Sequence, residues 1–402
     1  MNGFTPFQIM DSFNFKDYGS YLEQDFRHRW LRPLHLVQKL SKFQRVDDLL
    51  IEVAGGSVEG RDIYTIKWGS GPIKILCWTQ MHGNEPTATM AVIDLLNFLA
   101  SQDKYDDLRE LLKAKVQITF VPMLNPDGAE AFTRRNALGI DPNRDALVQQ
   151  TPEIQTLLKV VEELKPDWCF NLHDQRNIFS VGDTKKTATI SFLAASADIA
   201  KTLTPTRKLA MSLIGVMNEA LNDILSGKIG KYTDEYYHRA LGEHFHKNEI
   251  PCVLIESGAY KGDPTRNMAR QANFLALLKA FETIAKGKLN TTEIERYLAI
   301  PQNTTNMLDV IIRDCEVSLK GQTIKMDIGL LYEEKPNFDT NQLERYFILN
   351  DIGDLQYQFG IEEERGGLLA TPYQNLKLGA PANFIVKRKN NTVLEFINGI
   401  QK

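Results

Sequence analysis

Three things are scarce in this sequence: cysteine, basic charge and long apolar runs. The four cysteines, Cys77, Cys169, Cys252 and Cys315, are widely scattered, which argues against a disulfide framework or a sulfur-bound metal and favours a reducing compartment. Lys and Arg number 47 against 51 Asp and Glu, and this net charge of −4 argues against nucleic acid as the main partner. No stretch approaches the roughly 20 apolar residues of a membrane span, and residues 1–6 show no secretory signal. We therefore expect a cytoplasmic protein with no nucleic-acid or membrane partner.

Strand-like and helix-like segments alternate over residues 50–285. The 402-residue length suits one large domain plus a smaller one, and 43% hydrophobic residues provide ample material for a core. Apolar strand signals lie at 73–78, 116–121, 168–172 and 252–255, and helical patterns at 86–100, 153–164, 195–226, 233–247 and 272–285. This alternation predicts an α/β domain with a central mixed, largely parallel sheet and helices on both faces.

The two ends of the chain have a different pattern. Residues 14–43 have the spacing of an amphipathic helix interrupted at Pro33. After a boundary near 286–290, short strand signals follow at 308–312, 323–332, 382–387 and 392–397. We predict three parts: an N-terminal helical segment at 1–48, the catalytic domain at 49–288 and a small β-rich domain at 291–402.

A His and a Glu stand three residues apart where an apolar strand gives way to a helix. At this spacing the His82 imidazole and the Glu85 carboxylate can point at one centre, while Gly83 permits a tight turn and Pro86 suits the first helical position. In α/β sheets the ends of the strands are where functional sites are placed. His82 and Glu85 are therefore candidate metal ligands.

Two further strand-like runs end in residues that can bind a metal ion or exchange a proton. His173 follows the run at 168–172, so it can supply a third ligand and leave the fourth position of a tetrahedral metal site open for water. Glu256 ends the run at 252–255 and is followed by Ser257 and Gly258; it can act as a general base.

Arginine and asparagine side chains gather in the loops between these strands. Arg134, Arg135, Asn143 and Arg144 suit the stabilisation of an oxyanion or the grip of a substrate carboxylate. The alternative is that these arginines are solvated or pair with nearby aspartates.

Five motifs, taken in order, resemble those of the zinc carboxypeptidase family, the carboxypeptidase A-like peptidases. The resemblance covers roughly residues 50–285, and the order and intervals of the motifs argue against coincidence. The motifs are His82-Gly83-Asn84-Glu85, Asn125-Pro126-Asp127-Gly128, Asp141-Pro142-Asn143-Arg144, Leu172-His173-Asp174 and Ile255-Glu256-Ser257-Gly258.

The resemblance implies a hydrolase that removes the C-terminal residue of a peptide through a metal-activated water. It implies one Zn²⁺ per chain on His82, Glu85 and His173, the ligand type known for carboxypeptidase A, with Glu256 as general base and acid. It further implies that Arg134 polarises the scissile carbonyl, with Arg135 as a near-equal candidate. Asn143 and Arg144 would hold the free carboxylate of a peptide or small amide substrate.

Some features depart from the family pattern. Glu85 and His173 are 173 − 85 = 88 positions apart, which is shorter than in the digestive members. The family's mobile substrate-binding tyrosine has four candidates here, and the pattern does not choose among Tyr232, Tyr236, Tyr237 and Tyr260.

Two other functions compete with the peptidase hypothesis. A zinc amidohydrolase related to aspartoacylase and succinylglutamate desuccinylase would act on N-acyl amino acids, and those relatives share a similar His-Gly-Asn-Glu motif and a β-rich C-terminal domain. A degenerate binding protein would keep the fold without catalysis. The Asn125-Pro126-Asp127-Gly128 motif and the length of the catalytic region favour the peptidase.

Overall fold

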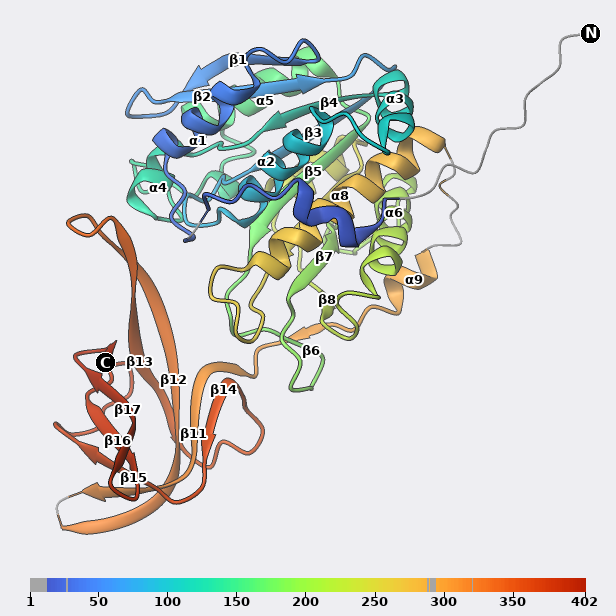
Figure 1. Cartoon of the computed structure of the whole chain (residues 1–402). Helices are drawn as coiled ribbons and strands as arrows, with labels where there is room; N and C mark the ends of the chain where they lie inside the picture. The colour runs from blue at the N-terminus through green and yellow to red at the C-terminus, as the bar shows by residue number, and fades with distance from the viewer. Residues whose placement is uncertain (1–12, 27, 288, 290–293, 320) are drawn as a thin grey trace, which may run out of the picture.

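The computed structural model describes residues 13–402, except residues 27, 288, 290–293 and 320. Figure 1 shows a larger α/β lobe, residues 13–306, and a C-terminal lobe of strands, residues 307–402. The boundary predicted near 286–290 falls partly outside the described residues, so the three-part division stays a prediction. The predicted α/β class with a β-rich C-terminal region is confirmed.

An eight-stranded mixed sheet forms the centre of the larger lobe. Its order is β1-β2-β4-β3-β5-β9-β7-β8, and the pairs β3–β4, β3–β5, β5–β9 and β7–β8 are parallel. The strands are β1 (Leu49–Gly56), β2 (Asp62–Trp68), β3 (Ile73–Thr79), β4 (Val116–Val121), β5 (Trp168–Asp174), β7 (Ile190–Ala194), β8 (Ile229–Lys231) and β9 (Cys252–Ser257).

The three strands that precede the predicted site residues are neighbours in this sheet. Because β3, β5 and β9 run parallel, their carboxyl ends meet at one edge. In the register of β5 and β9, His173 lies directly opposite Glu256. The sheet therefore brings together residues that are far apart in the sequence.

Helices cover both faces of this sheet. One buried apolar cluster contains residues of α2, α3, α6 and α8, and a second contains residues of α5 and α7. The helices are α1 (Pro33–Leu40), α2 (Thr87–Leu99), α3 (Asp106–Lys115), α4 (Pro126–Ala131), α5 (Pro152–Leu164), α6 (Pro205–Leu221), α7 (Leu241–Lys247), α8 (Asn267–Lys286) and α9 (Ile294–Leu298), with 3₁₀ turns η1 (Phe15–Ser20), η2 (Ser41–Phe43) and η3 (Pro142–Arg144).

Three helix predictions were too long. Among the described residues of 14–43, only η1, α1 and η2 are helical, because side chains there bond to distant partners; the Tyr18 hydroxyl, for example, donates to Asp94 at 2.7 Å. The stretch 195–226 contains helix only from Pro205, where Thr204 caps the first turn by accepting from the Arg207 amide. In the stretch 233–247 the helix α7 begins only at Leu241.

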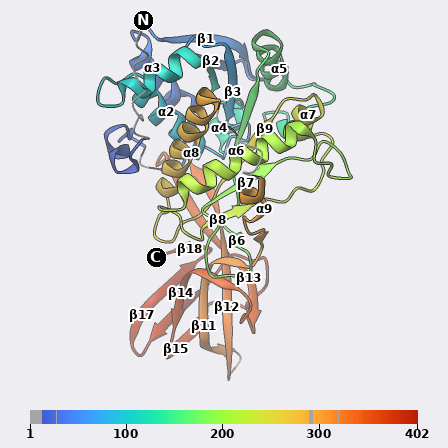
Figure 2. The same cartoon turned by 90° about the vertical axis from the view of Figure 1, so that its right-hand side faces the viewer.

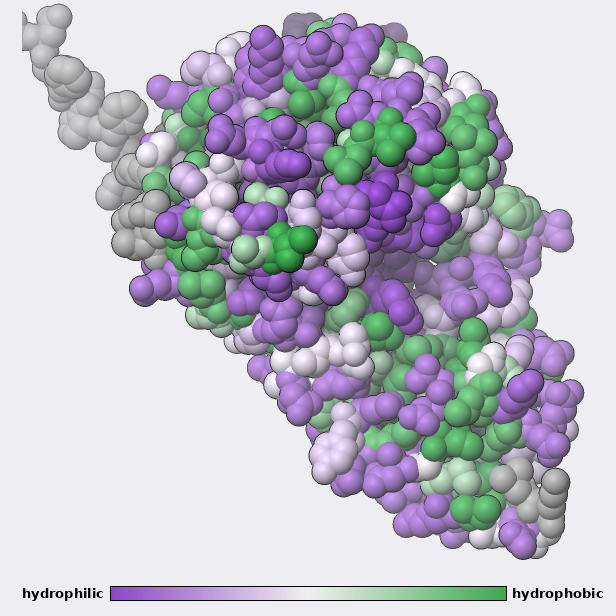
Figure 3. Space-filling view, turned by 180° about the vertical axis from the view of Figure 1, so that it is seen from behind, coloured by the Kyte–Doolittle hydropathy of each residue, from purple (hydrophilic) through white to green (hydrophobic). Residues whose placement is uncertain are grey.

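Strands make up the C-terminal lobe, which lies below the larger lobe in Figures 1 and 2. Its sheet has the order β13-β12-β11-β15-β16-β17-β18, and β14 pairs with β11. The strands are β11 (Met307–Leu319), β12 (Gln322–Asn337), β13 (Gln342–Gly353), β14 (Phe359–Arg365), β15 (Leu368–Pro372), β16 (Phe384–Arg388), β17 (Asn391–Ile397) and β18 (Ile400–Gln401); a separate pair, β6 (Ser180–Val181) and β10 (Asn303–Thr304), lies where the lobes join. Seen from behind, a hollow bordered by hydrophilic residues lies between the lobes (Figure 3).

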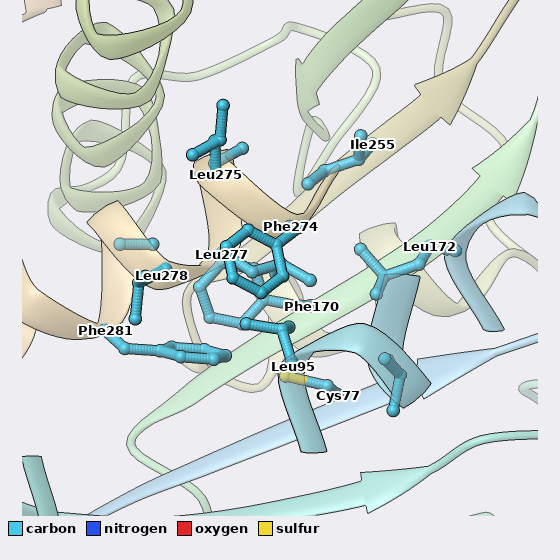
Figure 4. Packing of buried hydrophobic residues seen from close by; sticks show 14 of the residues in the cluster. Cys77, Leu95, Phe170, Leu172, Ile255, Phe274, Leu275, Leu277, Leu278 and Phe281 are labelled. Carbon is cyan, nitrogen blue, oxygen red and sulfur yellow. The ribbon is translucent and has the colours of Figure 1, made fainter. Parts of the chain in front are cut away.

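Aromatic and aliphatic side chains between the sheet and α8 hold the site-bearing strands in place. Figure 4 shows Phe170 of β5 and Phe281 of α8 in contact, with ring centroids 5.7 Å apart and near-perpendicular planes. Leu172 and Ile255, from neighbouring strands, belong to the same cluster. Burial of each such side chain stabilises the folded state by roughly 1.5–3 kcal/mol. This packing holds the strands that carry the site residues in place.

Candidate active site

A tight loop between β3 and α2 holds the first two predicted ligands. Gln80 has a left-handed backbone (φ 47°), which is uncommon for a residue other than glycine. Its side-chain amide donates to the carbonyls of Gly83 (2.9 Å) and Leu31 (3.1 Å), and its oxygen accepts from Thr89 (2.9 Å). A Cβ on Gly83 would lie 1.8 Å from the carbonyl carbon of Gly128. Glycine is therefore required there by the close approach of two loops.

The three predicted metal ligands converge at the edge of the sheet. The Nδ1 atom of His82 lies 2.9 Å from Oε1 of Glu85, and Nδ1 of His173 lies 2.9 Å from Oε2 of the same carboxylate. One possible ligand atom from each residue lies within 4.8 Å of the others, and all three side chains are buried. Two imidazoles and a carboxylate at this spacing form a donor set of the kind that binds zinc.

Asp141, a residue to which the sequence prediction gave no role in the site, fixes the orientation of His82. Its Oδ1 lies 3.0 Å from Nε2 of His82, so Nδ1 is left facing the centre of the cluster. Burial alone would lower the pKa of His82, but the carboxylates of Glu85 and Asp141 outweigh it and raise that pKa. Burial would raise the pKa of Glu85, yet the two histidines hold it well below its usual range. Burial lowers the pKa of His173, and Glu85 offsets this only in part.

These residues fit a zinc ion. The cluster has two ring nitrogens and a carboxylate directed at one point, and Asp141 supplies the outer hydrogen bond typical of a metal-bound imidazole. The low pKa of Glu85 and the low pKa of His173 both favour the deprotonated forms that bind metal. Nε2 of His173 is buried and has no hydrogen-bond partner among the described residues, so only one of the two imidazoles has such an outer contact.

Glu256 lines the same cavity from the neighbouring strand. Its carboxyl is buried, and Oε2 has no hydrogen-bond partner among the described residues. Burial, reinforced by the negative charge of Glu85, raises the pKa of Glu256 well above its usual range. A carboxyl in this condition is suited to take and return protons near neutral pH.

The structure distinguishes the two arginines that the sequence left as near-equals. The Arg134 guanidinium donates to Asp141 Oδ2 (3.0 Å) and Glu85 Oε1 (3.2 Å), and it lines the cavity. The Arg135 guanidinium donates to the carbonyl of Gly139 (2.9 Å) and is not among the residues that line the cavity. The substrate-binding role predicted for Arg135 therefore receives no support from its position.

Asn143 and Arg144 line the cavity beside two of the candidate tyrosines. Asn143 is held by the amide of Leu241, which donates to its side-chain oxygen at 3.0 Å. The Arg144 guanidinium carbon lies 4.9 Å from the centre of the Tyr237 ring. Tyr232 and Tyr237 line the cavity, whereas Tyr236 and Tyr260 do not. The cavity has a volume of about 820 Å³.

Residues of the C-terminal lobe and of the N-terminal segment also line this cavity, which the sequence analysis did not anticipate. Arg29 bonds to Asp174, next to His173, at 2.8 Å, and also to Glu334 of β12. Asn177 donates to Asp309 (2.9 Å) and to the Tyr332 hydroxyl (2.8 Å). No sequence motif marks these residues, because their contacts join segments more than 100 positions apart.

Comparison with known proteins points to the same family. Residues 37–150 match the family model described as zinc carboxypeptidase. Carboxypeptidase 2 of Trichophyton rubrum is 32% identical over 103 residues, which are 25% of this chain and 19% of that protein. Carboxypeptidase SOL1 of Arabidopsis thaliana is 31% identical over 97 residues, or 23% of this chain and 20% of that protein. The chain thus spans about a fifth of the length of these relatives.

Solved structures share the fold of the larger part of the chain. A metallo-carboxypeptidase from Burkholderia cenocepacia has a TM-score of 0.51 and 19% identity, and the match covers 63% of this chain and 69% of that one. Bovine thrombin-activatable fibrinolysis inhibitor, in complex with tick carboxypeptidase inhibitor, has a TM-score of 0.51 and 11% identity over 67% of this chain and 99% of that one. The predicted resemblance to the zinc carboxypeptidase family is confirmed. In the part of the chain that the structure describes, no helix is long and apolar enough to cross a bilayer.

Proposed function

We propose that this protein is a zinc-dependent carboxypeptidase that hydrolyses the C-terminal peptide bond of a peptide with a free carboxylate. One observation supports this most strongly: a triad of possible metal ligands, a buried carboxyl and an arginine line a single cavity. His82, Glu85 and His173 form the triad, Glu256 is the carboxyl and Arg144 is the arginine. The cytoplasmic location expected from the sequence stays a prediction.

The metal would be held by His82 Nδ1, His173 Nδ1 and the Glu85 carboxylate. When bound, zinc supplies a Lewis acid and brings the pKa of a coordinated water near 7. Glu256 takes a proton during attack on the scissile carbonyl and returns it to the departing amine. Its buried position opposite His173 in the sheet register places it beside the triad.

Two arginines have the remaining roles, which are stabilisation of the carbonyl oxygen and binding of the terminal carboxylate. Arg134, held by Asp141 and Glu85 at the edge of the triad, is placed to donate to the carbonyl oxygen as negative charge develops there. Arg144, with Asn143, binds the terminal carboxylate through a charge-assisted contact and so selects the last peptide bond.

The proposal is tested by mass spectrometry of a mixed peptide library incubated with zinc-loaded protein. Stepwise loss of C-terminal residues is expected, together with no loss from the same peptides in amidated form. A parallel set of N-acyl amino acids examines the amidohydrolase alternative. If N-acyl amino acids are cleaved and peptides are untouched, the carboxypeptidase proposal is wrong.

A further inference from the structure

The β12–β13 hairpin, residues 322–353, forms one wall of the active-site cavity. The cavity is lined by residues 331–335 of β12, by Ile348 and Asn350 of β13, and by the triad itself. In Figure 1 this hairpin rises from the C-terminal lobe toward α4 of the larger lobe. The wall of the site is thus supplied by a segment that lies 158 or more positions beyond His173, since 331 − 173 = 158.

The hairpin is fixed to the larger lobe near its tip. The rings of Phe338 and Trp30 meet edge-on with centroids 5.1 Å apart, and Arg32 donates to Asn341 at 2.9 Å. Trp30 is itself fully buried and donates to the carbonyls of Ala129 and Glu130, both at 3.2 Å. The tip therefore rests on a well-anchored residue.

Close to its tip, the hairpin is also fixed by buried charge. Arg29 bridges Asp174 and Glu334, and the exposed fractions of these side chains are 7%, 2% and 10% respectively. Arg345, opposite Glu334 in the register, donates to the Pro264 carbonyl at 3.3 Å. Removing one partner of a buried charge pair is costly, so the hairpin is a fixed wall and not a freely swinging flap.

Within the described chain, the hairpin is joined to residues beside the triad and not to the Arg144 end of the cavity. The terminal carboxylate belongs beside Arg144, next to Tyr237 and Asn143. The hairpin instead contacts Arg29, Asn177 and Pro264, and among the described residues no hydrogen bond or ion pair joins it to Asn143, Arg144 or Tyr237. A substrate chain that begins at Arg144 and passes the triad must therefore continue toward the hairpin.

We infer that the β12–β13 hairpin limits the length of the acyl portion, so that the enzyme acts on short peptides and not on proteins. The inference rests on the proposed carboxypeptidase function. A cavity of about 820 Å³ falls in the range that encloses a ligand of drug size, which corresponds to a peptide of a few residues. Longer acyl portions meet the anchored wall formed by Glu333, Glu334 and Lys335.

The test is a ladder of peptides that share the best C-terminal pair found in the library and carry one, two, four or eight residues on the acyl side. Wild type is compared with a variant in which residues 333–346 are replaced by Asn-Gly, a two-residue turn suited to the facing pair Tyr332 and Phe347. A second variant, Arg32→Ala with Phe338→Ala, releases the tip without shortening the chain. Tyr357→Ala, an exposed side chain of the same lobe outside the cavity lining, is the control.

For wild type and the control, kcat/KM is expected to fall at least about tenfold from the shortest to the longest peptide. The shortened hairpin should recover most of that loss, and the tip variant part of it, with zinc content and circular dichroism unchanged. Equal rates for all lengths in wild type, or an unchanged length profile in a folded shortened variant, would overturn the inference alone. Cleavage of no ladder member by any protein would instead overturn the proposed function.

Discussion

Replacement of Glu256 by glutamine separates proton transfer from metal binding. The substitution preserves the shape of the side chain and removes its ability to exchange a proton. Because Glu256 is not part of the candidate metal-binding cluster of His82, Glu85 and His173 found among the described residues, zinc affinity should stay within a few fold of wild type. Turnover should fall sharply, since Glu256 is the carboxyl that lies opposite His173 in the sheet register.

The size of the loss follows from the role of the group. General acid–base catalysis contributes roughly 10²–10⁴-fold, or about 3–5.5 kcal/mol of transition-state stabilisation. Two opposing effects act on stability: replacing a carboxyl whose ionised form burial disfavours removes that penalty, whereas an amide beside the unpartnered Oε2 position costs about 1–3 kcal/mol. We therefore expect a folded protein with little change in the free energy of unfolding.

The assay combines kcat on a cleavable peptide, zinc content after dialysis and thermal unfolding. Glu282→Gln is the matched control, because Glu282 is a buried carboxylate on α8 that pairs with Lys279 and Lys286 away from the cavity. It should keep wild-type kcat. If Glu256→Gln loses zinc, or if it retains more than about a tenth of wild-type kcat, Glu256 does not have the role proposed here.

Four further outcomes are expected. Arg144→Ala should raise KM about 10–100-fold for free carboxylates and leave amidated analogues unchanged; equal loss on both would contradict the assignment. Asp141→Asn should weaken zinc binding about 10–100-fold by loosening His82, as measured by competition with a chelator; unchanged affinity would exclude this role. Burial raises the pKa of Asp309 from 3.8 to about 6, so the folded state binds more protons than the unfolded state between these values, and stability falls as pH rises. Relative to Asp309→Asn, wild type should lose roughly 2–3 kcal/mol of unfolding free energy between pH 4 and 7, and parallel denaturation profiles would refute this. Gly83→Ala should cost about 1–3 kcal/mol and reduce zinc content, because its Cβ would overlap Gly128; normal zinc binding would show that the loop adapts.

The local pattern of the chain predicted the secondary structure best where apolar runs are long. The strands that became β3, β5 and β9 and the helices α2 and α5 lie where their periodicity placed them, because their apolar faces suit a sheet covered on both sides. The stretches 14–43, 195–226 and 233–247 are helical only in part, for the opposite reason. Their apolar residues pack against distant elements and their polar groups bond there, so long-range contacts override local preference.

The candidate ligands His82, Glu85 and His173 and the candidate base Glu256 could be named from the sequence because each follows an apolar strand. The sequence does not give the distances between these four residues. The parallel pairing of β3, β5 and β9 brings these residues to one edge, and the loop that carries His82 and Glu85 packs against Gly128 through Gly83.

The different surroundings of Arg134 and Arg135 and the far wall of the cavity depend on the tertiary structure alone. Adjacent arginines look alike in sequence, and they differ only in which carboxylates or carbonyls lie within reach of each guanidinium. Likewise, nothing local in residues 331–335 indicates a site. The hairpin becomes part of the cavity because Arg29, Trp30 and Arg32 of the N-terminal segment hold it across the sheet edge, through contacts that span some 300 positions. The sequence thus determined which reactive residues follow the strands. The shape of the cavity around them depended on contacts that form only in the folded chain.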